Sequence, residues 1–134
     1  GRMGAATIRA MQKHYGTDPK HLICAIGPSI CQDCYEVSED VADAFKEEFG
    51  AEISQDDSTS CYSWNGKSIL MNKGNGKYQL DLWGANRLVL LDVGILPEHL
   101  AVTNVCTKCN PDLLYSHRVM GDKRGNLAAF LSLK

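Results

Sequence analysis

The sequence has 134 residues and a mass of 14.7 kDa, a size that fits one domain with a hydrophobic core of its own. Its hydrophobic content of 44% and its charged content of 22% are typical of an ordinary globular protein. The formal net charge of −2 argues against a general nucleic-acid binder, and no apolar run is long enough to cross a bilayer. Because the chain also starts without a signal-peptide pattern, we expect a cytoplasmic protein.

The first half of the chain predicts two helices and one buried strand. Apolar residues at helical spacing predict a helix over residues 2–15. Residues 22–26 are apolar throughout and too few for a helix, so they predict a short buried strand, and the Gly-Pro-Ser sequence at 27–29 turns the chain sharply after it. A second helix is predicted over residues 38–50, because Ser38 is a good N-cap and a glycine follows the last apolar residue.

The second half begins with a polar stretch over residues 51–60 that we interpret as irregular. Residues 61–71 predict a β-hairpin, because an Asn-Gly pair at its centre supplies the positive φ angles of a tight turn. Residues 73–77 are interpreted as a flexible connector, residues 81–91 as a helix and residues 100–105 as a strand. Since helices and strands intermix and a hairpin is present, these patterns indicate an α+β or mixed α/β class.

The most distinctive stretch is the last part of the chain, residues 106–134, where apolar flanks bracket a basic centre bounded by glycines. Its basic side chains are His117, Arg118, Lys123 and Arg124. Arginine presents a planar set of donors that matches phosphate or carboxylate, and histidine can exchange a proton near neutral pH. The functional interpretation is an anion-binding loop between two short strands. The alternative is a solvated hairpin loop, since such loops are usually charged.

Six cysteines are many for a chain of this length. In a reducing compartment they are expected to be free, metal-bound or redox-active rather than disulfide-bonded. Cys31 with Cys34 and Cys106 with Cys109 form two Cys-x-x-Cys pairs, which together could hold one tetrahedral zinc ion through four thiolates. The pairs are much farther apart than the roughly 15–20 residues of a compact zinc ribbon, and neither opens a helix after a strand as a thioredoxin-like dithiol does. Plain thiols therefore remain the simplest interpretation.

Six short segments match a known family in order and spacing. They are residues 25–30 (Ala-Ile-Gly-Pro-Ser-Ile), 34–37 (Cys-Tyr-Glu-Val), 81–86 (Asp-Leu-Trp-Gly-Ala-Asn), 106–107 (Cys-Thr), 115–118 (Tyr-Ser-His-Arg) and 125–129 (Gly-Asn-Leu-Ala-Ala). Through them the chain resembles the bacterial laccase-domain family, which is also called the polyphenol oxidase or YfiH-like family and is described as purine nucleoside phosphorylases. The segments are spread over nearly the whole chain.

The resemblance implies an α+β fold in which helices flank mixed β-sheets. It also implies a zinc-dependent enzyme that cleaves adenosine, inosine, guanosine or methylthioadenosine with phosphate, and that deaminates adenosine as a second activity. The partners would then be purine nucleosides and phosphate. An earlier description as a copper-dependent oxidase of phenols is also attached to the family.

The resemblance assigns no metal ligand to this sequence. The family holds its metal with two histidines and a cysteine, and the second histidine belongs to a His-Ala-Gly-Trp-Arg-Gly-like motif expected just before the helix at residues 2–15. None of the four histidines lies in such a context. We therefore expect an incomplete domain that resembles the C-terminal half of the enzyme. It would be inactive alone and could form a homo-oligomer through exposed apolar surface.

The basic stretch supplies the first expected substrate-binding residues, the Gly-Pro-Ser turn at 27–29 is expected to form another wall of the pocket, and no catalytic residue is assigned. Arg118 and Arg124 are expected to bind phosphate or nucleoside oxygens, and His117 either bonds the ligand or braces its loop. The full set is Gly27, Pro28, Ser29, Ser116, His117, Arg118 and Arg124. The alternatives to an enzyme are a non-enzymatic, zinc-stabilised binding module built on the two Cys-x-x-Cys pairs, and a thiol-redox or plain binding protein.

Overall fold

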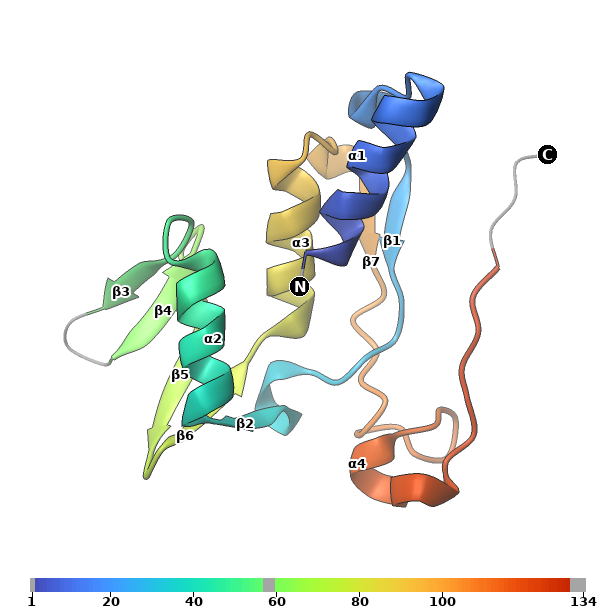
Figure 1. The fold of residues 1–134 in the computed structure, drawn as a ribbon. Helices are drawn as coiled ribbons and strands as arrows, with labels where there is room; N and C mark the ends of the chain where they lie inside the picture. The colour runs from blue at the N-terminus through green and yellow to red at the C-terminus, as the bar shows by residue number, and fades with distance from the viewer. Residues whose placement is uncertain (1, 57–59, 131–134) are drawn as a thin grey trace.

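The computed structural model describes residues 2–56 and 60–130, which form an α+β fold (Figure 1). Within these residues the α-helices are α1 (Met3–Tyr15), α2 (Glu39–Phe49), α3 (Leu82–Asp92) and α4 (His117–Met120). The strands are β1 (Cys24–Ile26), β2 (Glu36–Ser38), β3 (Ser54–Asp56), β4 (Cys61–Trp64), β5 (Lys67–Gly74), β6 (Lys77–Leu80) and β7 (Leu100–Val102). One five-stranded antiparallel sheet has the order β2-β6-β5-β4-β3, and β1 and β7 form a two-stranded parallel sheet. The expected class of mixed β-sheets flanked by helices is confirmed.

Two tight turns build the centre of the five-stranded sheet. Asn65 and Gly66, with φ angles of 48° and 73°, join β4 to β5, as their sequence predicted. Asn75 and Gly76, with φ angles of 54° and 68°, join β5 to β6 in the same way. The interpretation of residues 73–77 as a flexible connector is therefore wrong, because this second Asn-Gly pair closes a hairpin.

The main hydrophobic core lies between α2, α3 and the five-stranded sheet. Its largest fully buried side chains are Ile69 and Leu70 from β5 and Leu88 from α3. Phe45 and Phe49 of α2 stack with their ring centroids 4.5 Å apart and belong to the same core. An amphipathic helix packed on a sheet is the expected way to bury the apolar faces of both elements.

A smaller core lies between α1, α3 and the two-stranded sheet. Its buried side chains are Ile8, Ile95 and Leu100, and Leu90 of α3 packs against them. Because Leu88 of α3 belongs to the main core, α3 packs on both cores and fixes the two sheets relative to each other. None of the helices in the described part of the chain combines the length and the apolar character needed to cross a bilayer.

Several strand boundaries differ from those the sequence predicted. β1 begins at Cys24 rather than at residue 22, since Ile23 is 75% exposed and lies outside the pairing with β7. β7 ends at Val102 rather than at residue 105. The stretch 51–60 is not wholly irregular, because residues 54–56 pair with β4 as β3. Residues 57–59 of that stretch lie outside the described residues.

The basic C-terminal stretch is not a loop between two short strands. Its described residues, 106–130, contain α4, the single 3₁₀ turn Gly121–Lys123 and no strand. The amides of Val119 and Met120 both donate to the carbonyl of Ser116, which closes a helical turn where a loop was expected. Residues 124–130 then form an extended segment that leads back from α4 toward the level of β1 and β7 without joining either sheet (Figure 1).

Candidate functional site

Two segments that are far apart in the sequence form a cavity of about 440 Å³, which we call the C-terminal cavity. The segment after β1 contributes Ser29, Ile30 and Tyr35. The segment after β7 contributes Thr107, Tyr115, Ser116, His117, Arg118, Arg124, Gly125, Asn126 and Leu127. None of these lining residues is acidic, and two are arginines, so the lining favours a negatively charged ligand.

The parallel pairing of β1 with β7 brings these segments together, and its hydrogen bonds continue past the strand ends. The amide of Thr103 donates to the carbonyl of Ile26 at 3.0 Å. The amide of Ser29 donates to the carbonyl of Val105, and the amide of Thr107 to the carbonyl of Ser29, both at 3.2 Å. Ser29 and Thr107 therefore lie side by side beyond the carboxyl ends of parallel strands, where open α/β sheets bind their ligands.

Arg118 is held in place by the segment that follows β1. Its guanidinium lies over the ring of Tyr35, 5.3 Å from the centroid, and its Nη2 donates to the carbonyl of Glu36 at 3.1 Å. These contacts use one of the five N–H groups of the side chain in a hydrogen bond. Arg118 is thus oriented, while most of its donors stay available to a ligand.

The second arginine of the cavity is held within its own segment. The Nη1 of Arg124 donates to the side-chain carbonyl of Asn126 at 3.2 Å. His117 begins α4 and is exposed, whereas Ser116 before it is only 4% exposed. The cavity therefore combines two oriented guanidinium groups with a buried serine.

The structure places five of the seven expected binding residues around the C-terminal cavity, namely Ser29, Ser116, His117, Arg118 and Arg124. Gly27 and Pro28 are exposed residues between β1 and Ser29 and do not line it. A Cβ atom at Gly27 would meet nothing within 4 Å, and its φ is not positive. A Cβ at position 27 would therefore meet no other part of the described chain.

Seven lining residues received no binding role from the sequence, although all of them lie in the matched segments. They are Ile30, Tyr35, Thr107, Tyr115, Gly125, Asn126 and Leu127. Thr107 is 9% exposed, and its place in the matched Cys-Thr segment was the sequence feature that could have pointed to it. Tyr115 packs against Gly125 so closely that a Cβ there would lie 2.6 Å from two ring atoms. Glycine is therefore required at position 125 for the ring to keep its place.

The four cysteines of the two Cys-x-x-Cys pairs lie close together, and three of them are sequence neighbours of residues that line this cavity. The Sγ atoms of Cys31, Cys34, Cys106 and Cys109 all lie within 4.8 Å of one another. The Sγ atoms of Cys34 and Cys109 are 3.5 Å apart. The amides of Cys31 and Cys109 donate to the Sγ of Cys106 at 3.3 and 3.4 Å. The fold therefore brings the two pairs together despite their long separation in the sequence, and the cluster could bind a metal such as zinc.

The pKa values of Cys31, Cys106 and Cys109 are shifted, and not all in the same direction. Burial opposes ionisation of Cys106, but the two backbone N–H groups that donate to its sulfur outweigh burial and lower its pKa to about 6. Hydrogen bonds that the Cys109 thiol donates to the sulfurs of Cys34 and Cys106 favour its protonated form and raise its pKa to about 12. Burial, followed by the neighbouring Cys106, raises the pKa of Cys31. Cys106 is therefore the cysteine of the cluster whose environment most favours the thiolate.

The metal site that the family resemblance implies does not fit the residues present. Among residues 2–56 and 60–130, the four cysteines are the one group of at least three histidine, cysteine, aspartate or glutamate side chains whose ligand atoms converge. No histidine belongs to it, whereas the family resemblance implies two. The described chain therefore supplies a sulfur cluster and no histidine-containing metal centre.

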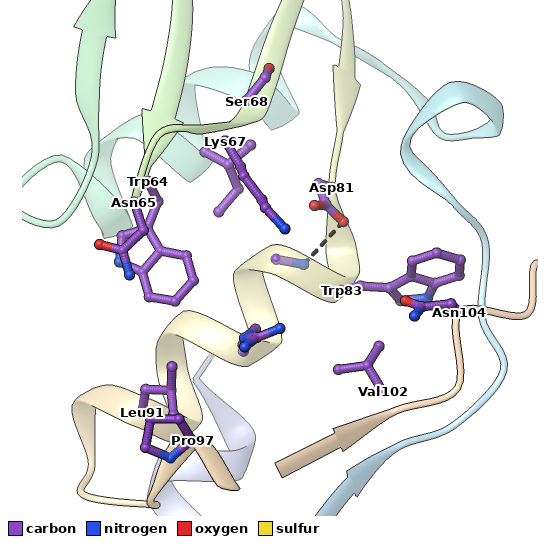
Figure 2. A pocket seen from close by; sticks show the side chains of 13 residues that line it. Trp64, Asn65, Lys67, Ser68, Asp81, Trp83, Leu91, Pro97, Val102 and Asn104 are labelled. Atoms are coloured by element: carbon purple, nitrogen blue, oxygen red, sulfur yellow. Dashed lines mark hydrogen bonds between the residues drawn. The ribbon is translucent and has the colours of Figure 1, made fainter.

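A second cavity, of about 420 Å³, lies between the β4–β5 turn, α3 and the end of β7, and we call it the hairpin cavity (Figure 2). Trp64 and Lys67 reach it from the hairpin and Trp83 from α3. Its acidic residue, Asp81, accepts a hydrogen bond from the amide of Gly84 at 3.0 Å and so caps α3. The carboxylate is thus used in capping, and the lining offers no paired acid and base.

Comparison with known proteins gives one family. Residues 1–134 match the family described as multi-copper polyphenol oxidoreductase laccase. The chain is 31% identical over 134 residues to the purine nucleoside phosphorylase YlmD of Bacillus subtilis, covering 99% of this chain and 43% of that protein. It is 31% identical over 125 residues to the adenosine deaminase RL5 of an unknown prokaryotic organism, covering 93% of this chain and 42% of that protein.

The fold agrees with a solved structure of this group. The crystal structure of YlmD from Geobacillus stearothermophilus superposes with a TM-score of 0.68 at 28% identity, over 88% of this chain and 39% of that chain. The chain therefore spans about two fifths of the length of the proteins it matches.

Proposed function

This chain belongs to the multi-copper polyphenol oxidoreductase laccase family, and on that premise we propose that it forms the phosphate-binding and nucleoside-binding part of a purine nucleoside phosphorylase. One observation carries the proposal: the C-terminal cavity presents two arginines and no acidic residue. Phosphate is a divalent or monovalent anion near neutral pH, so a lining of forked cations without carboxylates suits it.

The uncharged residues of the lining suit the other substrate. A nucleoside joins an aromatic base to a ribose with several hydroxyl groups. The cavity has the aromatic rings of Tyr35 and Tyr115 for apolar and stacking contacts, and the hydroxyls of Ser29 and Thr107 for hydrogen bonds. Its volume of about 440 Å³ lies within the roughly 300–1,000 Å³ range of small-molecule sites.

Phosphorolysis needs the groups that this cavity offers. Phosphate attacks C1′ of the ribose, the bond from C1′ to the purine nitrogen breaks, and the products are ribose 1-phosphate and the protonated base. Arg118 and Arg124 would hold the phosphate oxygens and orient them for attack, which lowers the entropic part of the barrier. Because the residues present do not fit the metal centre of the family, no step is assigned to a metal.

The test uses the complete gene product that carries this sequence, assayed for release of base from inosine and adenosine. We expect Arg118→Ala to raise the KM for phosphate by about 10–100-fold, since a hydrogen bond to a charged group contributes about 1.5–3 kcal/mol. Arg118→Lys should recover part of the loss, because it keeps the charge without the fork.

Lys123 provides the matched control, since it lies in the same segment but does not line the C-terminal cavity. Lys123→Ala should leave the KM for phosphate within about twofold, because a rim charge acts only through the general field. An equal effect of Lys123→Ala and Arg118→Ala, or none from either, would contradict the assignment of Arg118 to phosphate.

A second activity, the deamination of adenosine, is favoured by the relative that is named an adenosine deaminase. Here water rather than phosphate is the second substrate, and the C6 amino group leaves as ammonia. The same protein should then release ammonia from adenosine in phosphate-free buffer. Arg118→Ala should lower this rate far less than it lowers phosphorolysis, because no phosphate is bound in deamination.

A further inference from the structure

We propose that Cys31, Cys34, Cys106 and Cys109 bind one Zn²⁺ ion as a tetrahedral tetrathiolate site, and that this ion fixes the two walls of the C-terminal cavity to each other. The site is separate from the histidine-containing metal centre that the family resemblance implies. It stands whether or not the cavity binds nucleosides, because it depends on the sulfur geometry alone.

The sulfur positions fit zinc. Zinc bound by thiolates has Zn–S distances of about 2.3 Å, which places the corners of a regular tetrahedron about 3.8 Å apart. The four Sγ atoms lie within 4.8 Å of one another, and those of Cys34 and Cys109 are 3.5 Å apart. The observed separations therefore bracket the required edge, and small rotations of the side chains would complete the tetrahedron.

The backbone around the sulfurs has the second layer of contacts that structural metal sites need. The Sγ of Cys106 accepts two amide hydrogen bonds, from Cys31 and Cys109. The carbonyl of Cys106 accepts from both the amide and the side-chain amide of Asn110, at 3.2 and 2.8 Å. These bonds hold the Cys106–Cys109 turn with its sulfurs directed at the other pair.

The first pair is anchored to the five-stranded sheet. The side chain of Gln32 donates to the carbonyl of Ser68 at 3.3 Å, and the side chain of Gln79 donates to the carbonyl of Asp33 at 2.8 Å. Both middle residues of the Cys31–Cys34 pair thus have a bond to the sheet. A metal bound here would connect the C-terminal segment to the main body of the protein.

The C-terminal segment needs such a connection because it has little core of its own. In the described residues beyond 106, the buried ones are Thr107 and Ser116, and both are polar. Leu113 is 82% exposed and Phe130 is 94% exposed. A segment without a fully buried apolar side chain gains little from the hydrophobic effect, and a structural metal commonly takes that role.

The zinc site would act directly on the walls of the C-terminal cavity. Ile30, Tyr35 and Thr107 line the cavity, and each is the sequence neighbour of a cluster cysteine. Fixing the four sulfurs therefore fixes one lining residue beside Cys31, one beside Cys34 and one beside Cys106. Loss of the ion should loosen both walls together.

The main test compares the metal content of the purified protein and two double variants by mass spectrometry of the elements. Cys106→Ser with Cys109→Ser should contain one equivalent of zinc fewer than the wild type. Cys24→Ser with Cys61→Ser is the matched control, since these cysteines lie in β1 and β4, outside the cluster, and it should keep the full zinc content. Equal zinc in the two double variants would overturn the proposal.

A measurement on the wild-type protein covers the case in which the first double variant fails to fold. Titration of the thiols with a mercurial should release one zinc as the four cluster thiols react, and cobalt in place of zinc should give thiolate-to-cobalt charge-transfer bands with strong tetrahedral d–d bands. Iron bound in place of zinc would overturn the metal assignment. A protein mass lower by the hydrogens lost to a disulfide, with no zinc released, would overturn the site.

Discussion

Trp83 donates its indole N–H to the hydroxyl of Ser29, and this hydrogen bond connects the linings of the two cavities. Trp83 lines the hairpin cavity, where Figure 2 shows it projecting from the start of α3, and Ser29 lines the C-terminal cavity. The position of a hydroxyl in the positively lined cavity therefore depends on a side chain of α3, a helix that packs on both hydrophobic cores.

Trp83→Phe tests this dependence, because it keeps an aromatic ring and removes the donor. We expect the free energy of unfolding to fall by about 0.5–1.5 kcal/mol, the usual net value of one hydrogen bond. Phosphate should bind less tightly by less than about tenfold, since Ser29 loses its orientation but the arginines remain. Thermal unfolding and calorimetric titration with phosphate measure the two effects.

Trp64→Phe is the control for the loss of ring volume, since Trp64 lines only the hairpin cavity. It should leave phosphate affinity unchanged. The double variant Trp83→Phe with Ser29→Ala should cost less than the sum of the single changes, because both remove the same bond. Additive costs would mean that the bond contributes nothing.

The hairpins show what local sequence could and could not predict. Asn65-Gly66 was predicted as a turn from the positive φ angles that such a pair supplies, whereas Asn75-Gly76 was interpreted as part of a flexible connector. Both pairs adopt similar positive φ angles, so the same turn chemistry acts in a stretch with lysines at both ends. An Asn-Gly pair is therefore a stronger local signal here than the polarity of its surroundings.

The candidate site was harder to predict than the hairpins, because residues far apart in the sequence form it. Arg118 and Arg124 could be predicted from their side-chain chemistry, but Tyr35 meets Arg118 only through the tertiary fold. The cysteine pairs meet across 75 positions in the sequence because β1 and β7 pair in parallel. A parallel pair of three-residue strands leaves no short-range pattern from which its partner could be read.

Gly125→Ala should disturb the cavity through Tyr115. The added Cβ would lie 2.6 Å from two ring atoms, so the ring must move. We expect the KM for nucleosides to rise about 3–30-fold, corresponding to about 0.7–2 kcal/mol of lost contact, with a smaller change in the KM for phosphate. Steady-state kinetics with each substrate varied in turn separates the two effects.

The chain offers a matched control for this change in Gly27→Ala. A Cβ at Gly27 meets nothing within 4 Å, so this variant should behave as the wild type in kinetics and in Tm. Tyr115→Leu combined with Gly125→Ala should recover the Tm lost in Gly125→Ala alone. A Gly125→Ala protein with unchanged kinetics would show that Tyr115 does not contact the nucleoside.

Leu88→Ala should be the most destabilising of the changes considered, because Leu88 is only 1% exposed and lies in the main core on a helix that packs on both cores. Large-to-small changes at such sites cost about 2–5 kcal/mol, through lost apolar contact and the cavity left behind. Denaturant unfolding measures the loss in the free energy of unfolding, provided that the variant and the wild type show the same denaturant dependence. Leu113→Ala, at a side chain that is 82% exposed, should stay within about 0.5 kcal/mol of the wild type.

Arg2 joins the start of α1 to the end of α2. Its Nη2 donates to the carbonyl of Glu48 and to Oε1 of Glu52, both at 2.7 Å, and its guanidinium lies 4.5 Å from the ring centroid of Phe49. Hydrogen bonding to Glu52 is the largest cause that raises the pKa of Arg2, so the side chain stays charged at any pH at which the protein folds. The other carboxylate oxygen of Glu52 is buried and has no partner among the described residues.

Arg2→Met should therefore cost more than the loss of an exposed ion pair. It leaves the Glu52 carboxylate without a cation in a half-buried position, and we expect a loss of about 1–3 kcal/mol in the free energy of unfolding. Glu52→Gln in the same protein should restore part of this loss, because a neutral amide is cheaper to leave unpaired than a carboxylate. Lys73→Met, which breaks the exposed pair of Lys73 with Glu36, should cost at most about 1 kcal/mol. If Arg2→Met and Lys73→Met cost the same in denaturant unfolding, Arg2 is an ordinary surface cation and does not hold α1 to α2.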